Sequence, residues 1–404
     1  MVKIPVNLPI GSGRKAFLDH FNAQLSRRMN SSSGTAQRRL DGTFESRLSG
    51  AVAFDGGEIE LNLRYEESLD GHLYIEAERG GDEPSTVDWE QQIQGIVLDS
   101  LAAALTVRTQ SFFRRAYRYY IGPQLDGEYW FGKIRFAPAL PEDDQPSALN
   151  AERVVVFDQM IEAIDHLGAS LIGDEIVARI AARFSLLLDT ALYPARSELR
   201  WVSIEGGAST RHHLGFTGRH VAPQAMPRKA DLCRLGQWNG ELLPPYHEAG
   251  KLLSFPRQSR LLLRSIDHAS APITVAFDNC ARLYQVGLDV GRYYPSVRLA
   301  YHVSAVEVLS GVDSAGNFSD FMRKYCGLSR DELDPYLQFL YGSVRSSHFH
   351  AGIFPIGEYD CIDFPQAFMS SEYIDRSHRL RTATALIYAA IRNWLLAQLP
   401  SEAS

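Results

Sequence analysis

Apolar and polar residues alternate with a period of two over two stretches near the N-terminus. The first stretch runs from Glu58 to Glu66 and the second from Leu73 to Ala77. One apolar face opposite one polar face is typical of a half-buried antiparallel strand. Gly56-Gly57 precedes the first stretch, and Asp70-Gly71 separates the two, as turns would. The pattern therefore predicts a β-meander.

The period then becomes that of a helix. From Asp88 to Ala104 apolar residues recur every three or four positions, which predicts a helix packed on the meander. Tyr129 to Phe136 has the composition of a further strand, whereas the polar run from Asn30 to Gly34 is expected to be a short loop. We interpret residues 1–150 as a mixed α+β domain that contains an antiparallel sheet.

Residues 151–192 are expected to be helical. Breaks near Gly168 and Gly173 would make this stretch a helical hairpin, and Pro194 would end it. From Glu198 to Pro272 the sequence is irregular and rich in Gly, Pro, His and Arg. We therefore expect residues 151–270 to form a helical hairpin followed by an irregular α+β region.

After Pro272 the periodicity stays helical. Five helices are predicted, and together they would form a small antiparallel bundle over residues 271–400. They lie around Phe277–Leu288, from Pro295 to a cap at Gly311, from Phe318 to Tyr325, from Asp334 toward Arg345, and from Ser377 to Leu399. The predicted fold class is thus α+β, with a β-rich, mixed N-terminal region followed by an all-α bundle.

Composition narrows the class of protein. The 404 residues are 45% hydrophobic and 22% charged, which are the proportions of a soluble globular protein. The absence of a long apolar run predicts a cytoplasmic protein that does not use a membrane. The four cysteines form no Cys-x-x-Cys pair, so neither a disulfide framework nor a cysteine zinc site is expected. Because the formal net charge is −7, nucleic acid would have to bind at a local positive patch.

The most specific motif lies within the predicted bundle, from Tyr341 to Gly352. Its sequence is Tyr-Gly-Ser-Val-Arg-Ser-Ser-His-Phe-His-Ala-Gly, so four residues separate Arg345 from His350. Upstream, Glu307 lies in the helix that is predicted from Pro295 to Gly311. In a continuous helix a five-residue step turns about 140°, so the two side chains would diverge. We therefore expect the helix to end or bend near His350.

This segment resembles the signature of the Apea-like branch of the HEPN domain family, in which a Tyr-bearing helix carries Arg, four to six residues and then His. The glutamate-bearing helix upstream and the closing Arg/apolar helix are similar to those of the family. The resemblance covers about 130 residues. It implies a HEPN-like bundle that works as a metal-independent endoribonuclease, with no cofactor, and as a homodimer in which Arg and His pairs from both subunits line one cleft.

The chemistry that the resemblance implies is attack by a ribose 2′-hydroxyl on the adjacent phosphate, which leaves a cyclic phosphate end. The catalytic candidates are Arg345 and His350, with His348, Ser346 and Glu307 beside them. A histidine that titrates near neutral pH can take or give the proton, and a guanidinium can hold two phosphate oxygens. His348 is the alternative histidine, Glu307 would orient the arginine, and Ser346 stands where many active HEPN nucleases carry Asn, Asp or His.

Tyr341, Arg376 and Arg379 are the expected RNA contacts. The two arginines lie near the start of the last helix, where the helix dipole disfavours cations. Proteins with this domain are often toxins or antiphage effectors, so a regulatory protein or a phage-derived trigger is an expected partner besides RNA. The alternative is a non-catalytic HEPN module for dimerisation or RNA binding in a larger assembly. A third hypothesis places the main activity in the N-terminal region.

Two other clusters are interpreted structurally. Phe112 to Tyr120 interleaves arginines with aromatic residues, which favours a packed aromatic face and a solvated arginine face over a base-stacking surface. Arg211-His212-His213 and His220 lack the helical i, i+4 spacing of a metal site, so we expect surface loop residues and no bound metal.

Overall fold

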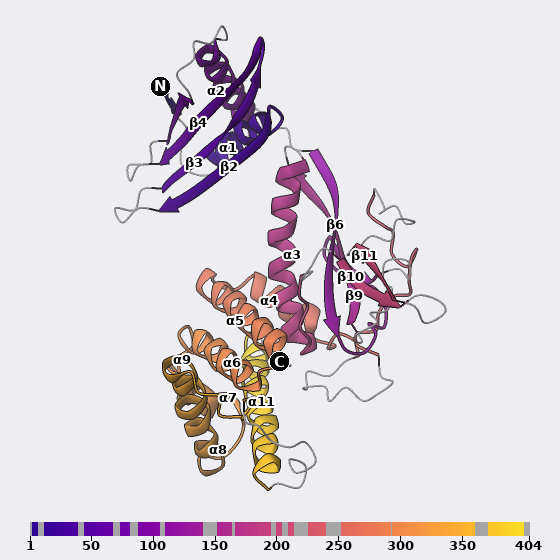
Figure 1. Ribbon diagram of the computed structural model, residues 1–404. Helices are drawn as coiled ribbons and strands as arrows, with labels where there is room; N and C mark the ends of the chain where they lie inside the picture. Colours follow the sequence, from indigo (N-terminus) through magenta and orange to yellow (C-terminus); the bar gives the residue numbers. More distant parts are fainter. Residues whose placement is uncertain are drawn as a thin grey trace. The chain divides into compact units, whose positions relative to one another are not determined.

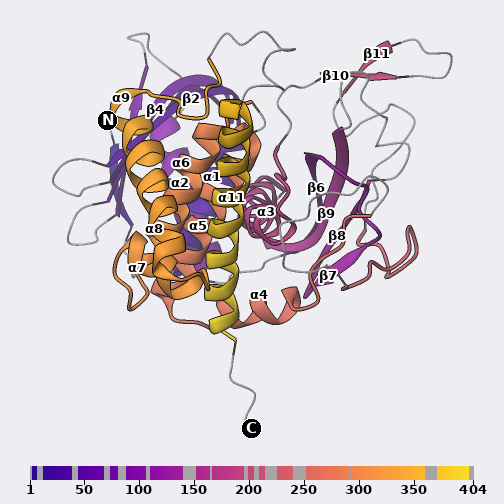
Figure 2. The same ribbon diagram turned by 90° about the horizontal axis from the view of Figure 1, so that it is seen from below.

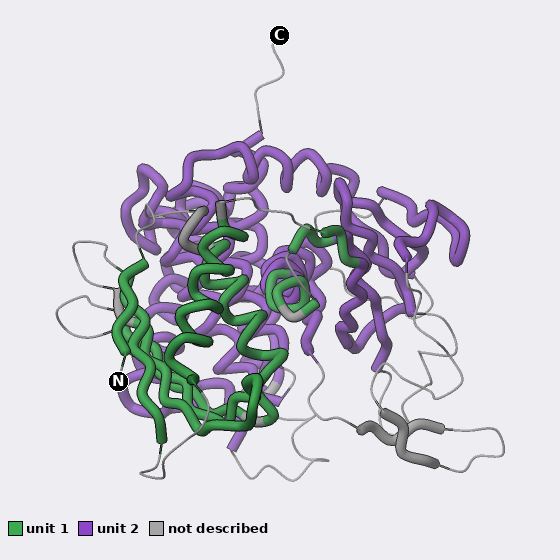
Figure 3. Tube along the Cα trace, turned by 90° about the horizontal axis from the view of Figure 1, so that it is seen from above, with its two compact units in different colours: residues 1–112, 161–172 green, residues 113–160, 173–404 purple. Residues whose placement is uncertain are grey.

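The computed structural model contains two compact units (Figures 1 and 3). Unit 1 is built from residues 1–112 and 161–172, and unit 2 from residues 113–160 and 173–404. The residues that the structure describes are 2–6, 12–38, 44–67, 73–80, 88–105, 110–139, 152–163, 166–194, 199–203, 209–213, 225–239, 252–291, 293–359 and 371–399. The predicted α+β class is confirmed, with sheets in the N-terminal half and helices in the C-terminal part.

Unit 1 is an antiparallel sheet of five strands with two helices. The strand order is β1-β5-β4-β3-β2, and each neighbouring pair is antiparallel. Apolar residues of both helices share one core with the sheet, including Phe21 and Ile93 from the helices and Leu61 and Ile75 from the strands. The elements are β1 (Val2–Val6), α1 (Ser12–Ser26), β2 (Met29–Arg38), β3 (Phe44–Phe54), β4 (Gly57–Glu67), β5 (Leu73–Arg79) and α2 (Trp89–Leu105).

The predicted meander and helix of this unit are confirmed, and one expected loop is wrong. Strands β4 and β5 pair through the alternating residues, and α2 covers the helical stretch after Asp88. The run from Asn30 to Gly34 belongs to β2, where it pairs with β3. Serine-rich segments form strands readily when a neighbouring strand supplies the backbone hydrogen bonds, because strand preference depends strongly on context.

Unit 2 begins with a second sheet, of order β6-β9-β8-β7. Its strands are β6 (Gln110–Ile121), β7 (Tyr129–Phe131), β8 (Ile134–Pro138) and β9 (Glu152–Ala163). The stretch expected as one strand from Tyr129 to Phe136 is instead a hairpin, because Gly132 turns the chain with φ near +60°. Outside this sheet, β10 (Leu199–Ser203) pairs antiparallel with β11 (Ser209–His213).

The predicted helical hairpin over residues 151–192 is wrong. Residues 152–163 form β9, whose run of three β-branched valines from Val154 to Val156 suits a strand. A single helix follows, α3 (His166–Leu188), which passes through Gly168 and Gly173 without interruption. From Gly173 onward α3 packs on the sheet, and its Phe184 ring lies 5.8 Å from that of Phe157 on β9.

A chain of buried ion pairs crosses this sheet. The Arg135 side chain is 1% exposed, and its guanidinium lies 2.7 Å from Glu128 and 2.9 Å from Asp158. Arg115 on β6 holds the same Asp158 through two hydrogen bonds of 2.7 and 2.8 Å. The expected solvated arginine face of residues 112–120 is therefore wrong at Arg115, because a carboxylate on the neighbouring strand pairs with it inside the protein.

The C-terminal part of unit 2 is helical (Figure 2). Helices α5, α6 and α11 pack around a common apolar core that includes Phe277, Val303 and Ile391. The helices predicted after Pro272 are all present. They are α5 (Ala271–Val290), α6 (Pro295–Ser310), α7 (Phe318–Tyr325), α8 (Arg330–Leu337) with its continuation in η1 (Gln338–Ser346) and α9 (Ser347–Ala351), and α11 (Ser371–Ala397). Helix α4 (Ser259–Asp267) precedes them, in the stretch that was expected to be irregular.

One guanidinium joins α3 to α4 and α5. Arg183, on α3, lies 2.6 Å from Asp267 at the end of α4 and 2.6 Å from Asp278 on α5. Its side chain is 7% exposed and lies over the ring of Phe277, 5.6 Å from the centroid. The sheet and the helices of unit 2 are therefore linked by the ion pairs of a buried guanidinium as well as by apolar contacts.

A second polar group is buried in the helical core. The His302 ring stacks on Tyr284, with centroids 4.0 Å apart, and its Nε2 lies 3.2 Å from the Tyr284 carbonyl oxygen. Burial first, and then the nearby charge of Arg298, lower the pKa of His302 well below its ordinary value. The imidazole is therefore neutral inside the folded protein.

We expect this histidine to make the fold sensitive to acid. The unfolded chain binds a proton at His302 near pH 6.5 and the folded chain does not, so stability falls as the pH drops below about 6.5, by up to ~1.4 kcal/mol per pH unit. His302→Phe keeps the stacked ring and removes the titrating group. Urea unfolding at pH 7.5 and pH 5.5 should show the variant gaining stability relative to the wild type at the lower pH. Parallel pH dependences would contradict this expectation.

Candidate active site

The segment that carries Arg345 winds as a π-helix. This segment, η1, continues α8, and α9 follows it without a break. A π-helix closes hydrogen bonds between residues five apart, and such turns are frequent at functional sites. The Ser347 hydroxyl donates to the Gly342 carbonyl at 3.1 Å, across the same five-residue spacing. A helix through this stretch was predicted, but its widened winding was not.

The helix ends at Ala351, one residue after His350, and so near His350 as predicted. Gly352 adopts the left-handed conformation, with φ of 65°. The backbone N–H groups of Gly352 and Ile353 donate to the carbonyls of His348 and Ser347 at 3.1 and 3.3 Å. These two bonds are the pattern of a glycine-terminated helix, and they fix where the chain turns away.

Arg345 faces Glu307 on the neighbouring helix α6. Its Nε lies 3.3 Å from the Glu307 carboxylate, and the two side chains are 30% and 26% exposed. The angle does not suit a hydrogen bond, so the contact is an ion pair. The guanidinium also lies over the Tyr341 ring, 5.7 Å from its centroid. The structure thus brings together three of the predicted site residues.

The two histidines have different surroundings. His350 is exposed, and no hydrogen bond or ion pair from the described residues reaches its ring. His348 is partly buried against Phe354, with ring centroids 5.0 Å apart, and its Nδ1 has no hydrogen-bond partner among the described residues. Ser346, the last residue of η1, is partly buried. Of the two histidines, His350 is the more accessible to a substrate.

The chain after His350 is tied back to α6. The Glu358 carboxylate accepts hydrogen bonds from the backbone N–H and the hydroxyl of Ser296, the latter at 2.8 Å. The Ser296 hydroxyl in turn accepts from the backbone N–H of Ile356 at 3.0 Å. A carboxylate at a helix N-terminus is stabilised by the free N–H groups and the dipole. The site is therefore held at both ends of α6, by Glu307 at one and Ser296 at the other.

The predicted RNA contacts divide between two places. Tyr341 is exposed beside Arg345, and it stacks on Phe318 with centroids 5.8 Å apart. Arg379 lies over Phe339, 5.2 Å from the ring centroid. It lines a hollow of about 740 Å³ between η1 and the start of α11, whose lining includes neither Arg345 nor His350. Arg376 is partly buried on the same helix.

Comparisons with known proteins add little. No family model and no curated protein matches the sequence. Among solved structures, the chain is similar to the di-domain ARO/CYC StfQ from the steffimycin biosynthetic pathway, at 10% identity. The match covers 45% of this chain and 93% of that one, with a TM-score of 0.18. So low a score carries no argument about fold or function.

Other features bear on the remaining predictions. No group of three or more His, Cys, Asp or Glu able to hold a metal occurs in the described part of the chain. The expected loop residues Arg211-His212-His213 lie instead in β11, and His220 lies outside the described residues. Within the same described ranges, no helix combines the length and apolar character needed to cross a bilayer.

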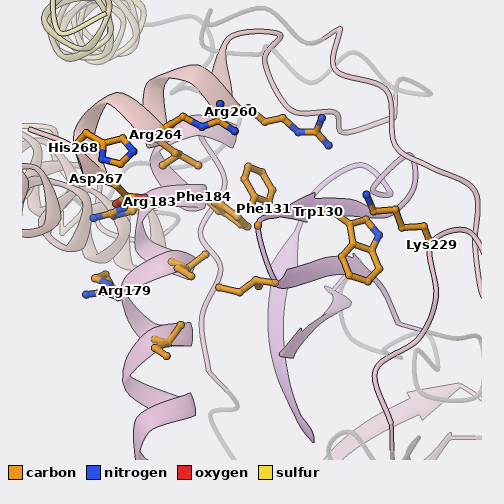
Figure 4. A pocket seen from close by; sticks show the side chains of 15 residues that line it. Trp130, Phe131, Arg179, Arg183, Phe184, Lys229, Arg260, Arg264, Asp267 and His268 are labelled. Atoms are coloured by element: carbon orange, nitrogen blue, oxygen red, sulfur yellow. Dashed lines mark hydrogen bonds and ion pairs between the residues drawn. The ribbon is translucent and has the colours of Figure 1, made fainter. Parts of the chain in front are cut away.

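Sequence reasoning missed a basic pocket of about 720 Å³ in unit 2, lined by the sheet and by helices α3 and α4 (Figure 4). Its arginines come in i, i+4 pairs, Arg179 with Arg183 on α3 and Arg260 with Arg264 on α4. That spacing puts each pair on one helix face. The signal was visible for α3, but α4 lies in the region that we interpreted as irregular.

Gly352 offers a test of the helix end. Alanine at its left-handed backbone conformation should destabilise the protein by about 1–2 kcal/mol. Gly342 is the matched control: it is also exposed with open space around its Cα, but its φ is negative. Gly342→Ala should therefore leave stability unchanged or slightly higher. Urea unfolding of both variants measures the difference, and equal effects would contradict the assigned role of Gly352.

Proposed function

We propose that the helical part of unit 2 is a HEPN-like domain and that the protein is a metal-independent endoribonuclease, acting as a toxin or antiphage effector. The observation that carries the proposal is the position of Arg345, which lies at the end of a π-helical turn, paired through Nε and partly exposed. This arrangement leaves the two terminal nitrogens for another ligand, because no hydrogen bond from the described residues reaches them. A guanidinium so placed suits two phosphate oxygens.

In the proposed reaction Arg345 stabilises the charge that develops on the phosphorane. His350, exposed at the end of the same helix, takes the 2′-hydroxyl proton or donates one to the leaving oxygen. Atoms balance without a co-reactant: the 2′-oxygen bonds to phosphorus, the 5′-oxygen leaves with a proton, and a 2′,3′-cyclic phosphate remains. His348 and Ser346 adjoin the pair, while Tyr341 would stack on a base.

The proposed reaction would be complete in a homodimer. One Arg345–His350 pair supplies one cation and one imidazole, whereas the reaction uses a cation, a base and an acid. Two pairs that face each other across a two-fold axis would supply both proton-transfer groups. His350 is exposed and the Tyr341 side chain is 45% exposed, so this face is available to a second copy of the chain.

The first test is cleavage of total RNA in the presence of a chelator. The wild type should cleave, and Arg345→Ala and His350→Ala should each lose activity by about 10²-fold or more, because each removes a group that acts in the transition state. The products should carry cyclic phosphate ends. A smaller loss in His348→Ala would assign the proton transfer to His350.

Two control variants match these substitutions. Arg330→Ala removes an arginine that is 75% exposed. Within the described residues, its ion pair is with Asp334 on the same helix. His166→Ala removes an exposed histidine of α3. Both should cleave RNA like the wild type. Unchanged activity in Arg345→Ala with an intact fold would refute the proposal.

Glu307 is proposed as a positioning residue. Glu307→Gln keeps the shape of the side chain and removes the charge that faces Arg345. We expect cleavage to fall about ten-fold while the free energy of unfolding changes by less than ~1 kcal/mol, because a partly exposed ion pair contributes little to stability. Cleavage rates and urea unfolding measure the two quantities. A large loss of stability with the specific activity retained would make Glu307 structural.

The ion pair itself favours a second candidate function. A carboxylate 3.3 Å from Arg345 within one chain is also what a non-catalytic dimerisation or RNA-binding module would show. The RNA experiment separates the two: such a module would bind RNA, weakened by Arg345→Ala, and would cleave none.

A further inference from the structure

The pocket in Figure 4 has walls of two kinds. One side is apolar and aromatic, with Trp130 and Phe131 from β7 and Phe184 from α3. The other side is basic, with Arg179 on α3 and Arg260 and Arg264 on α4. Lys229 lies beside Trp130, at the edge of the aromatic side. All of these residues belong to unit 2. The volume of about 720 Å³ is in the range of small-molecule sites.

The basic side carries charge that the protein does not neutralise. The pocket has one carboxylate, Asp267, and Arg183 already pairs with it at 2.6 Å. Within the described ranges, no ion pair joins Arg179, Arg264 or Lys229 to a carboxylate. The chain as a whole is acidic, at −7, so this is a local concentration of positive charge. A ligand with more than one negative charge would complement it.

The aromatic side is held rigidly. The Trp130 indole N–H donates to Glu128 at 3.0 Å, so it is not available to a ligand, and the partly exposed ring offers only its face and edges. Phe131 is fixed by neighbouring rings, with Phe184 at 4.4 Å and Phe255 at 5.1 Å between centroids. Lys229 lies over Trp130, 5.7 Å from the ring centroid. A rigid, apolar platform beside cations favours a flat ring attached to an anion.

We propose that this pocket binds a nucleoside phosphate, with its base on the aromatic side and its phosphates beside Arg179 and Arg264. The same chemistry is offered by a free nucleotide and by the phosphorylated end of an RNA strand. The proposal goes beyond RNA cleavage and does not depend on it, because its residues are separate from Arg345 and His350.

Binding is measured by calorimetry on the full chain, with ATP, adenosine and inorganic tripolyphosphate as probes. ATP should bind at least ten-fold more tightly than either fragment, because each fragment fills one side of the pocket only. Arg179→Ala and Arg264→Ala replace exposed side chains and should each weaken ATP about ten-fold. Arg330→Ala, a surface arginine of α8, should leave binding unchanged.

A 5′-phosphorylated hexanucleotide with 2′-O-methyl riboses, which resists attack by the 2′-hydroxyl, tests the source of the ligand. Competition with ATP together with tighter binding than ATP would assign the pocket to an RNA end, and weaker binding would assign it to the free nucleotide. The proposal is overturned if ATP does not bind at millimolar concentration, if tripolyphosphate binds as well as ATP, or if both arginine variants bind ATP like the wild type. Loss of RNA cleavage in Arg345→Ala has no bearing on this result.

Discussion

The two-way pairing of Arg183 is the interaction on which the organisation of unit 2 depends. The Arg183 side chain is 7% exposed, and a guanidinium that is withdrawn from water needs carboxylate partners. Here the partners come from α4 and α5, while α3 itself packs on the sheet through the next residue, Phe184. The ion pairs of Arg183 therefore connect the sheet, through α3, to the basic pocket and to helix α5 of the helical core.

The buried charges of the sheet follow the same rule. Arg115 and Arg135 converge on Asp158, and Arg135 also reaches Glu128. Glu128 in turn accepts a hydrogen bond from the backbone N–H of Ala230, next to Lys229. One network thus pairs the buried charges of the sheet and also fixes the segment that carries Lys229 at the pocket. The paired charges inside the sheet are connected to the charges that face the pocket, but they are different residues.

Much of the fold was predictable wherever one face of an element is apolar and the other polar. The alternation around Leu61 and Leu63 gave β4, and the helical spacing around Phe277 and Ala281 gave α5. Prediction was wrong at β9, because Val154 to Phe157 is buried and a short apolar run has no period that separates strand from helix. The motif located Arg345, and its expected partner Glu307, 38 positions away, came from the family resemblance, because no local pattern encodes that contact. The basic pocket was missed for a related reason, since it assembles four separate segments of the chain.

The π-helical winding of η1, which covers Gln338–Ser346, sets the direction in which the Arg345 side chain leaves the helix. In an α-helix each residue adds about 100° of rotation, so one residue more or fewer between α8 and Arg345 would turn the guanidinium by that angle about the helix axis. Leu333 and Leu337 anchor α8 in the core upstream, and Val344 anchors the segment itself. Homologous chains that differ in length by one position here would present a different side chain to Glu307, even if every other helix were preserved.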